Sequence, residues 1–154
     1  MLRFSWLILA ALLLAACGPL LPSATEQPLS TPQVSLPASA TIRLTKSGGI
    51  AGVMQTLEIK ADGQATVTDE RAGKTVSLKL TPAQLGRLQK LATETQFKAP
   101  DGPSGCADCF IYTVEIDSGS GKPAVFEADD VSLADSGISD MVDFLSTIME
   151  DALR

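Results

Sequence analysis

Alternating apolar and polar residues along the middle of the chain predict a series of short β-strands. Ile42 and Leu44 alternate with threonine and arginine, which is the period-two pattern of a strand with one buried face. The same alternation returns at residues 53–59, 65–68, 75–80, 110–116 and 124–128. Asp62-Gly63 separates two of these runs, and both residue types tolerate the positive φ of a tight hairpin. We therefore expect an antiparallel meander of four strands and, later in the chain, two more strands.

Two segments have the apolar spacing of amphipathic helices. In the first, Thr81 is a helix cap, Pro82 suits the first helical position and Gln84 completes a capping box. The leucines at 85, 88 and 91 then fall on one face. The second helix is expected from about Ser136, with an apolar stripe that runs from Ile138 to residue 152. The predicted order is β-β-β-β-α-β-β-α, an α+β fold with two helices packed on one face of an antiparallel sheet.

The first 16 residues have the pattern of a bacterial lipoprotein signal peptide. Arg3 supplies a positive charge, and the apolar run that follows ends in Leu14-Ala15-Ala16-Cys17, which resembles a lipobox. This run is shorter than the ~20 apolar residues that span a bilayer. We expect cleavage before Cys17 and attachment of acyl chains such as palmitate, which anchor the protein to the membrane. The alternative is an ordinary signal peptide that happens to end in a cysteine.

The segment 17–40 has the composition of a tether. It contains five prolines with serine and threonine between them, and Glu26 is its one charged residue. Such a segment has too little apolar surface to fold, and its prolines favour an extended chain that reaches ~70 Å at ~3.1 Å per residue. Residues 41–154 then form one domain. The expected location is therefore extracytoplasmic, in the bacterial cell envelope.

The charge of the chain is acidic and uneven. The sequence has 12 basic and 18 acidic residues, and loss of Arg3 with the signal peptide changes the net charge from −6 to −7. Residues 41–98 have a net charge of +4, whereas residues 99–154 have a net charge of −10. This balance repels phosphate backbones, so no nucleic-acid partner is expected. The acidic half is either a solvated face or a surface that steers a basic partner.

The composition offers no support for catalysis. The chain has no histidine, which removes histidine-based triads, the usual zinc sites and the commonest general base. Trp6 is the only tryptophan, and it belongs to the signal peptide. We therefore predict no catalytic residue, no metal and no cofactor, and a protein that is not an enzyme.

Cys106 and Cys109 form the only reactive-looking motif, a C-x-x-C. A redox pair of this spacing opens a helix in thioredoxin-like folds, whereas here it lies in a loop before a strand. Outside the cytoplasm a local structural disulfide is expected, because that environment oxidises thiols. Redox exchange and free or metal-bound thiols are the alternatives.

Asp129, Asp130 and Asp135 are the densest acidic cluster. Calcium favours carboxylate oxygens that converge from one loop, but the spacing of the known calcium loop is missing. Solvated side chains are expected instead, with Asp135 near the start of the last helix, where the helix dipole favours an anion.

The most distinctive string is Ser47-Gly48-Gly49-Ile50-Ala51-Gly52. Its glycines let the backbone turn tightly or approach another surface closely; a plain hairpin loop is the alternative. After a strand, this string is similar to the opening of the emfourin family, small inhibitors of thermolysin-like metalloproteases such as protealysin. The string Asp108-Cys109-Phe110-Ile111-Tyr112 resembles a second emfourin motif, and the helices fall in the same order.

The resemblance covers most of residues 40–150 and implies a non-enzymatic binding domain that inhibits a metalloprotease. It implies a protein partner in addition to the membrane, with Ser47, Gly48, Gly49, Ile50, Ala51 and Gly52 as candidate contacts and the loop 95–109 as another. The chain has Ile50 where an aromatic residue is expected and carries the additional C-x-x-C. The alternatives are an envelope lipoprotein that binds another kind of protein, and a thiol redox protein.

Overall fold

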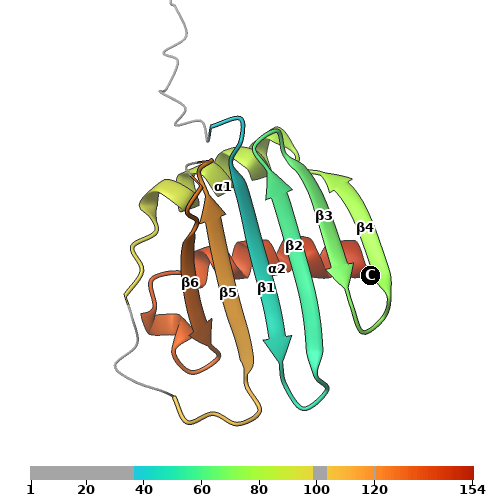
Figure 1. Cartoon of the computed structure of the whole chain (residues 1–154), viewed down its shortest axis with the longest axis vertical. Helices are drawn as coiled ribbons and strands as arrows, with labels where there is room; N and C mark the ends of the chain where they lie inside the picture. Colours follow the sequence, from blue (N-terminus) through green and yellow to red (C-terminus); the bar gives the residue numbers. More distant parts are fainter. Residues whose placement is uncertain (1–36, 99–103, 120) are drawn as a thin grey trace, which may run out of the picture. The chain divides into compact units, whose positions relative to one another are not determined.

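Six antiparallel strands form a single sheet in the computed structural model of the protein, which describes residues 37–98, 104–119 and 121–154 (Figure 1). The predicted signal peptide, Cys17 and the predicted tether up to residue 36 lie outside these ranges, as do residues 99–103 of the candidate loop 95–109. The strands are β1 (Thr41–Gly48), β2 (Val53–Lys60), β3 (Gln64–Asp69), β4 (Lys74–Lys79), β5 (Phe110–Asp117) and β6 (Ala124–Asp129). Their order across the sheet is β4-β3-β2-β1-β5-β6.

The six strands confirm the alternation that the sequence shows. Tight turns join the first four strands as a meander, with Gly63 at φ +81° and Gly73 at φ +60°. The position of β5 is a feature that the alternation does not specify. It pairs with β1 over all eight residues of each strand, from Thr41–Asp117 to Gly48–Phe110. The first strand is therefore central.

Helix α1 (Pro82–Glu94) begins as predicted. The hydroxyl of Thr81 accepts the backbone N–H of Gln84, and the Gln84 side chain accepts the backbone N–H of Thr81. Helix α2 (Ser139–Leu153) begins three residues later than the predicted Ser136. The prediction was wrong because Gly137 adopts a left-handed φ of +76°, which a continuous helix does not permit. A short 3-10 helix, η1 (Leu133–Asp135), precedes this glycine.

The hydrophobic core lies between one face of the sheet and the two helices. In Figure 1, α2 crosses behind the strands, and the front face of the sheet carries no helix. The residues with the most completely buried large side chains come from both layers: Ile42, Leu44, Leu57, Ile59, Val67, Leu88, Val114, Ile138, Met141, Val142, Leu145 and Met149. This α+β architecture is the predicted one. None of the described helices is long and apolar enough to cross a membrane.

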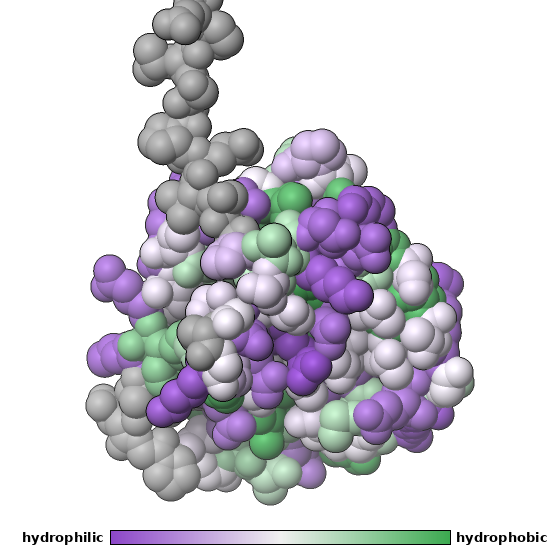
Figure 2. All heavy atoms as spheres, turned by 45° about the horizontal axis from the view of Figure 1, so that its top comes forward, coloured by the Kyte–Doolittle hydropathy of each residue, from purple (hydrophilic) through white to green (hydrophobic). Residues whose placement is uncertain are grey.

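The other face of the sheet is uncovered and largely polar. At its centre the guanidinium of Arg43 lies 2.7 Å from a Glu58 oxygen on β2 and 3.2 Å from a Glu115 oxygen on β5. The hydrogen bond to Glu58 is the main reason that the pKa of Arg43 is raised. Figure 2 shows mainly hydrophilic and neutral residues on this side, with apolar residues in separate areas. The two ion pairs thus link the three central strands.

The two ends of the sheet differ in what they carry. The chain enters at one end through Pro37–Ala40, where Ala40 is buried and its carbonyl accepts the backbone N–H of Ala61. We call this the tether end. Strand β1 then carries the chain about 23 Å, at ~3.3 Å per residue, to the turn before Val53. We call that opposite end the hairpin end (Figure 1).

A candidate binding surface at the hairpin end

The glycine-rich string forms the turn between β1 and β2. Gly48, Gly49 and Gly52 adopt φ values of +95°, +67° and +59°, and the N–H of Gly52 donates to the Gly49 carbonyl at 2.9 Å. Other residues rarely adopt such left-handed conformations. Ile50 stands at the tip with 91% of its surface exposed. The turn therefore presents one large apolar side chain on a backbone that glycine makes possible.

This turn is attached to the loop that contains the two cysteines. The N–H of Gly49 donates to the carbonyl of Cys109 at 3.1 Å. A Cβ on Gly48 would lie 2.7 Å from that same oxygen, and a Cβ on Gly49 would lie 2.7 Å from the ring of Phe110. The glycines therefore let the turn approach Cys109 and Phe110 closely, and they also let the chain reverse direction. The glycine turn therefore adjoins the described end of the candidate loop 95–109, residues 104–109.

Cys106 and Cys109 are joined by a disulfide, as predicted, with a Cα–Cα distance of 5.7 Å. The pair lies in a loop that leads into β5, so it does not open a helix. A helix N-terminus stabilises the thiolate in dithiol oxidoreductases, and this pair has no such support. The disulfide instead closes a small ring that ends at Cys109, whose own carbonyl accepts the N–H of Gly49.

Asp129 and Asp130 hold the same loop from the other side. A carboxylate oxygen of Asp130 accepts the backbone N–H of Phe110 at 2.8 Å, and the second accepts the Tyr112 hydroxyl at 3.1 Å. Asp129 accepts the hydroxyl of Ser104 and the backbone N–H of Ser132. The acidic cluster was predicted to consist of solvated side chains. Ser132 is a local partner, but Ser104, Phe110 and Tyr112 lie 18 to 25 residues away along the chain, so no local pattern predicts that these carboxylates hold the loop.

These hydrogen bonds shift two pKa values. The hydroxyl of Ser104, followed by the backbone N–H of Ser132, lowers the pKa of Asp129 to about 2. Partial burial, followed by the hydrogen bond to Asp130, raises the pKa of Tyr112 to about 12. At neutral pH Asp129 is therefore ionised and Tyr112 is protonated, which are the forms that accept and donate these hydrogen bonds.

Lys46 connects this end of the sheet to helix α2. Its ammonium lies 4.5 Å from the ring centroid of Phe110 and 5.9 Å from that of Tyr112. It also lies 3.7 Å from a carboxylate oxygen of Glu150, and its side chain is only 15% exposed. Such cation–π contacts are stronger when they are partly desolvated. The lysine thus supports the two aromatic residues of the second sequence motif from the core side.

Exposed apolar side chains gather on the uncovered face beside the turn. Ser47 pairs with Met54 on one side and with Ile111 on the other. Met54 is 38% exposed and Ile111 is 40% exposed. Together with Ile50 they form what we call the hairpin-end patch. Asp129 pairs with Ile111 across the strands, so its carboxylate lies beside this apolar patch. Such a surface suits a partner that has an apolar pocket surrounded by basic residues.

The remaining acidic residue of the sequence cluster lies apart from this site. Asp135 belongs to η1 and not to the first turn of α2, where Asp140 stands instead, so the predicted dipole role for Asp135 was wrong. Within the described ranges, no group of three or more histidine, cysteine, aspartate or glutamate side chains is placed to hold a metal ion.

Comparisons with known proteins leave the chain without a family assignment. No protein-family model matches it, and a search of curated proteins finds no similar sequence.

Proposed function

We propose that this chain is a lipid-anchored, non-enzymatic binding protein of the bacterial cell envelope, whose partner contacts the hairpin end of the domain. The observation that carries the proposal is the junction between the glycine turn and the disulfide loop. This junction is held by the hydrogen bond from the Gly49 N–H to the Cys109 carbonyl, by the disulfide and by Asp129 and Asp130. The surface that results projects Ile50. A surface ordered before binding loses less entropy when a partner docks.

The position of this surface supports display away from a membrane. The chain that leads back to the proposed lipidated Cys17 enters at the tether end, and the hairpin-end patch lies at the opposite end of β1. An anchored domain with this geometry presents Ile50 to proteins outside the membrane. The resemblance to emfourins makes a thermolysin-like metalloprotease our proposed partner, because an inhibitor fills a cleft with a rigid projecting element.

A titration with a matched control tests this proposal. The protein from Pro32 onward contains the whole described core and is titrated into a thermolysin-like protease secreted by the same cell. We expect inhibition that Ile50→Asp weakens at least tenfold, because buried hot-spot residues contribute about 1–4 kcal/mol. Val125→Asp is the control, since Val125 is also exposed (53%) but lies on β6 opposite Glu115 and away from the turn.

Unchanged proteolysis at large excess would end the inhibitor proposal. The broader proposal then depends on affinity capture from envelope and secreted proteins. A captured protein that is not a protease, and whose binding Ile50→Asp abolishes, would replace the protease as partner. The redox alternative predicts instead that mild dithiol reductants open the disulfide and that the domain exchanges it with other thiols.

A further inference from the structure

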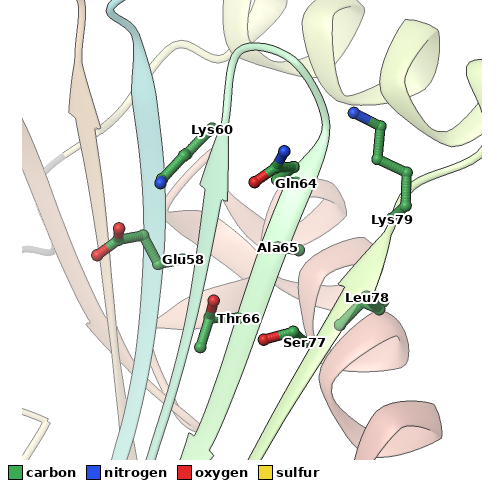
Figure 3. Close-up of a pocket in the computed structure, with 8 residues that line it drawn as sticks. All are labelled: Glu58, Lys60, Gln64, Ala65, Thr66, Ser77, Leu78 and Lys79. Atoms are coloured by element: carbon green, nitrogen blue, oxygen red, sulfur yellow. The ribbon is translucent and has the colours of Figure 1, made fainter.

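A hollow of about 380 Å³ lies on the uncovered face, at the tether end of β2, β3 and β4 (Figure 3). The register explains its shape. Thr66 pairs with Glu58 on one side and Ser77 on the other, and in the next row Gln64 pairs with Lys79. Short threonine and serine side chains form the floor, while longer side chains stand around it: Glu58, Lys60, Gln64 and Lys79. Ala65 and Leu78 also line the hollow, but its other lining residues are polar.

The charges around this hollow leave it open to an anion. The carboxylate of Glu58 already forms an ion pair with the guanidinium of Arg43, at 2.7 Å. Lys79 lies 3.8 Å from Asp62, and both side chains are more than half exposed, so this pair is weak and readily exchanged. Within the described part of the chain, the ammonium of Lys60 has no ion pair or hydrogen bond.

The floor of the hollow adds neutral donors. The hydroxyls of Thr66 and Ser77 and the side-chain amide of Gln64 make no hydrogen bond with other described residues. Two lysines and three neutral donors line one open hollow, and this set suits a group with several acceptor oxygens. A phosphate is such a group, and lysine binds it as a point charge without a fixed geometry.

We propose that this hollow binds the phosphate of an anionic phospholipid headgroup and seats the tether end of the domain on the membrane. The position of the hollow favours a lipid headgroup over a free phosphate. Lys60 pairs directly with Thr41, and the neighbouring Ala61 donates to the carbonyl of Ala40. The site therefore lies where the chain from Cys17 enters the domain. This proposal depends on the proposed lipid anchor.

The charge distribution across the sheet favours the strands that form the hollow. The hollow belongs to strands of the basic segment 41–98, whereas β5, β6 and α2 belong to the acidic segment 99–154. An anionic membrane attracts the first region and repels the second. Because the hairpin-end patch lies at the other end of β1, headgroup binding at the hollow turns that patch away from the lipid surface.

Vesicle sedimentation with the unlipidated protein from Pro32 to Arg154 tests the site separately from the anchor. We expect binding at low ionic strength to vesicles that contain phosphatidylglycerol, and weaker binding to pure phosphatidylcholine vesicles. The double variant Lys60→Gln/Lys79→Gln should bind at least tenfold more weakly, since each lysine near an anionic membrane contributes about fivefold. Arg71→Gln/Lys90→Gln removes the same charge at exposed positions outside the hollow and should retain most of the binding.

A second variant keeps both lysines. Ser77→Glu places a carboxylate on the floor and should abolish vesicle binding while circular dichroism stays unchanged. Equal losses in the two double variants, or no dependence on phosphatidylglycerol, would overturn the proposal. So would amide shifts around the hollow with inorganic phosphate but none with vesicles, because that result assigns the site to a free anion. A failed lipidation experiment with intact vesicle binding would contradict the anchor and not the hollow.

Discussion

At the scale of single residues, the hairpin end depends on a few side chains and glycines that bring distant segments into contact. Gly49 turns the chain and, having no Cβ, leaves room for the Phe110 ring. Asp129 and Asp130 join the end of β6 to the disulfide loop. These contacts involve backbone groups of exposed segments. Their loss therefore affects the order of the surface more than the core.

Gly49→Ala should destabilise the protein by about 2–3 kcal/mol, because the alanine adds left-handed strain and a clash with Phe110. Gly52→Ala is the matched control. Gly52 has a similar φ of +59°, but a Cβ there would meet nothing within 4 Å, so only the strain of about 1 kcal/mol remains. Urea denaturation measures both variants. Equal losses of stability would contradict the role of the ring contact.

Asp129 should make the order of the disulfide loop pH-dependent in acid. Its folded pKa of about 2 is below the unfolded value of about 4. The stability that the ionised carboxylate contributes is therefore complete above about pH 4 and is lost as the pH falls toward 2. Amide exchange of Ser132, followed by NMR, measures this loss.

Asp129→Asn should remove that acid-dependent step while the core stays folded. Glu127→Gln is the control, because it removes the same charge from an exposed position on the same strand. An unchanged acid profile in Asp129→Asn would show that another group controls the loop.

At the scale of elements, each strand and helix follows its local pattern, but the pairing of β5 with β1 creates the candidate surface. That pairing places Phe110 opposite Gly48 and Ile111 opposite Ser47. The disulfide loop thereby ends beside the glycine turn. Helix α2 supports the arrangement through Glu150 and Lys46.

Replacement of both cysteines, as Cys106→Ser/Cys109→Ser, should cost about 2 kcal/mol or less, because the disulfide closes a ring of only four residues. The fold should persist, since neither cysteine belongs to the core. We expect faster hydrogen exchange at the Gly49 amide, which donates to the Cys109 carbonyl. The Gly63 amide at the tether end is the control. Unchanged protection of Gly49 would contradict the proposed coupling.

At the scale of the whole molecule, the two ends of the domain differ in their chemistry. The tether end offers polar donors and lysines, whereas the hairpin end offers Ile50, Met54 and Ile111 beside ionised Asp129. With a lipid on Cys17, these ends face a membrane and a partner respectively.

Cys17→Ser should abolish labelled palmitate incorporation and release the protein from the membrane fraction, because a lipid-modified sulfur provides the main anchor. Membrane fractionation with an intact-leader control measures the result. The same variant should keep its affinity for a soluble partner, since Cys17 precedes the described domain. Membrane association without label would contradict the anchor.

Local sequence patterns determine the type and order of the elements in this protein. Alternation in the strands, the capping box at Thr81 and the Asp62-Gly63 turn each depend on neighbours in sequence, so the elements and the α+β class followed from the chain itself. The start of α2 did not follow from the sequence, because the apolar spacing around Gly137 is helical and does not reveal that this glycine adopts a left-handed φ.

Only the tertiary structure decided which segments meet. The β1–β5 pairing, the contact of Gly49 with Phe110, and the role of Asp129 and Asp130 join residues that lie tens of positions apart. The hollow between Lys60 and Lys79 likewise exists only because three strands align in one register. Periodicity reports which face of an element is buried, whereas long-range pairing selects the neighbours, and the candidate sites consist of those neighbours.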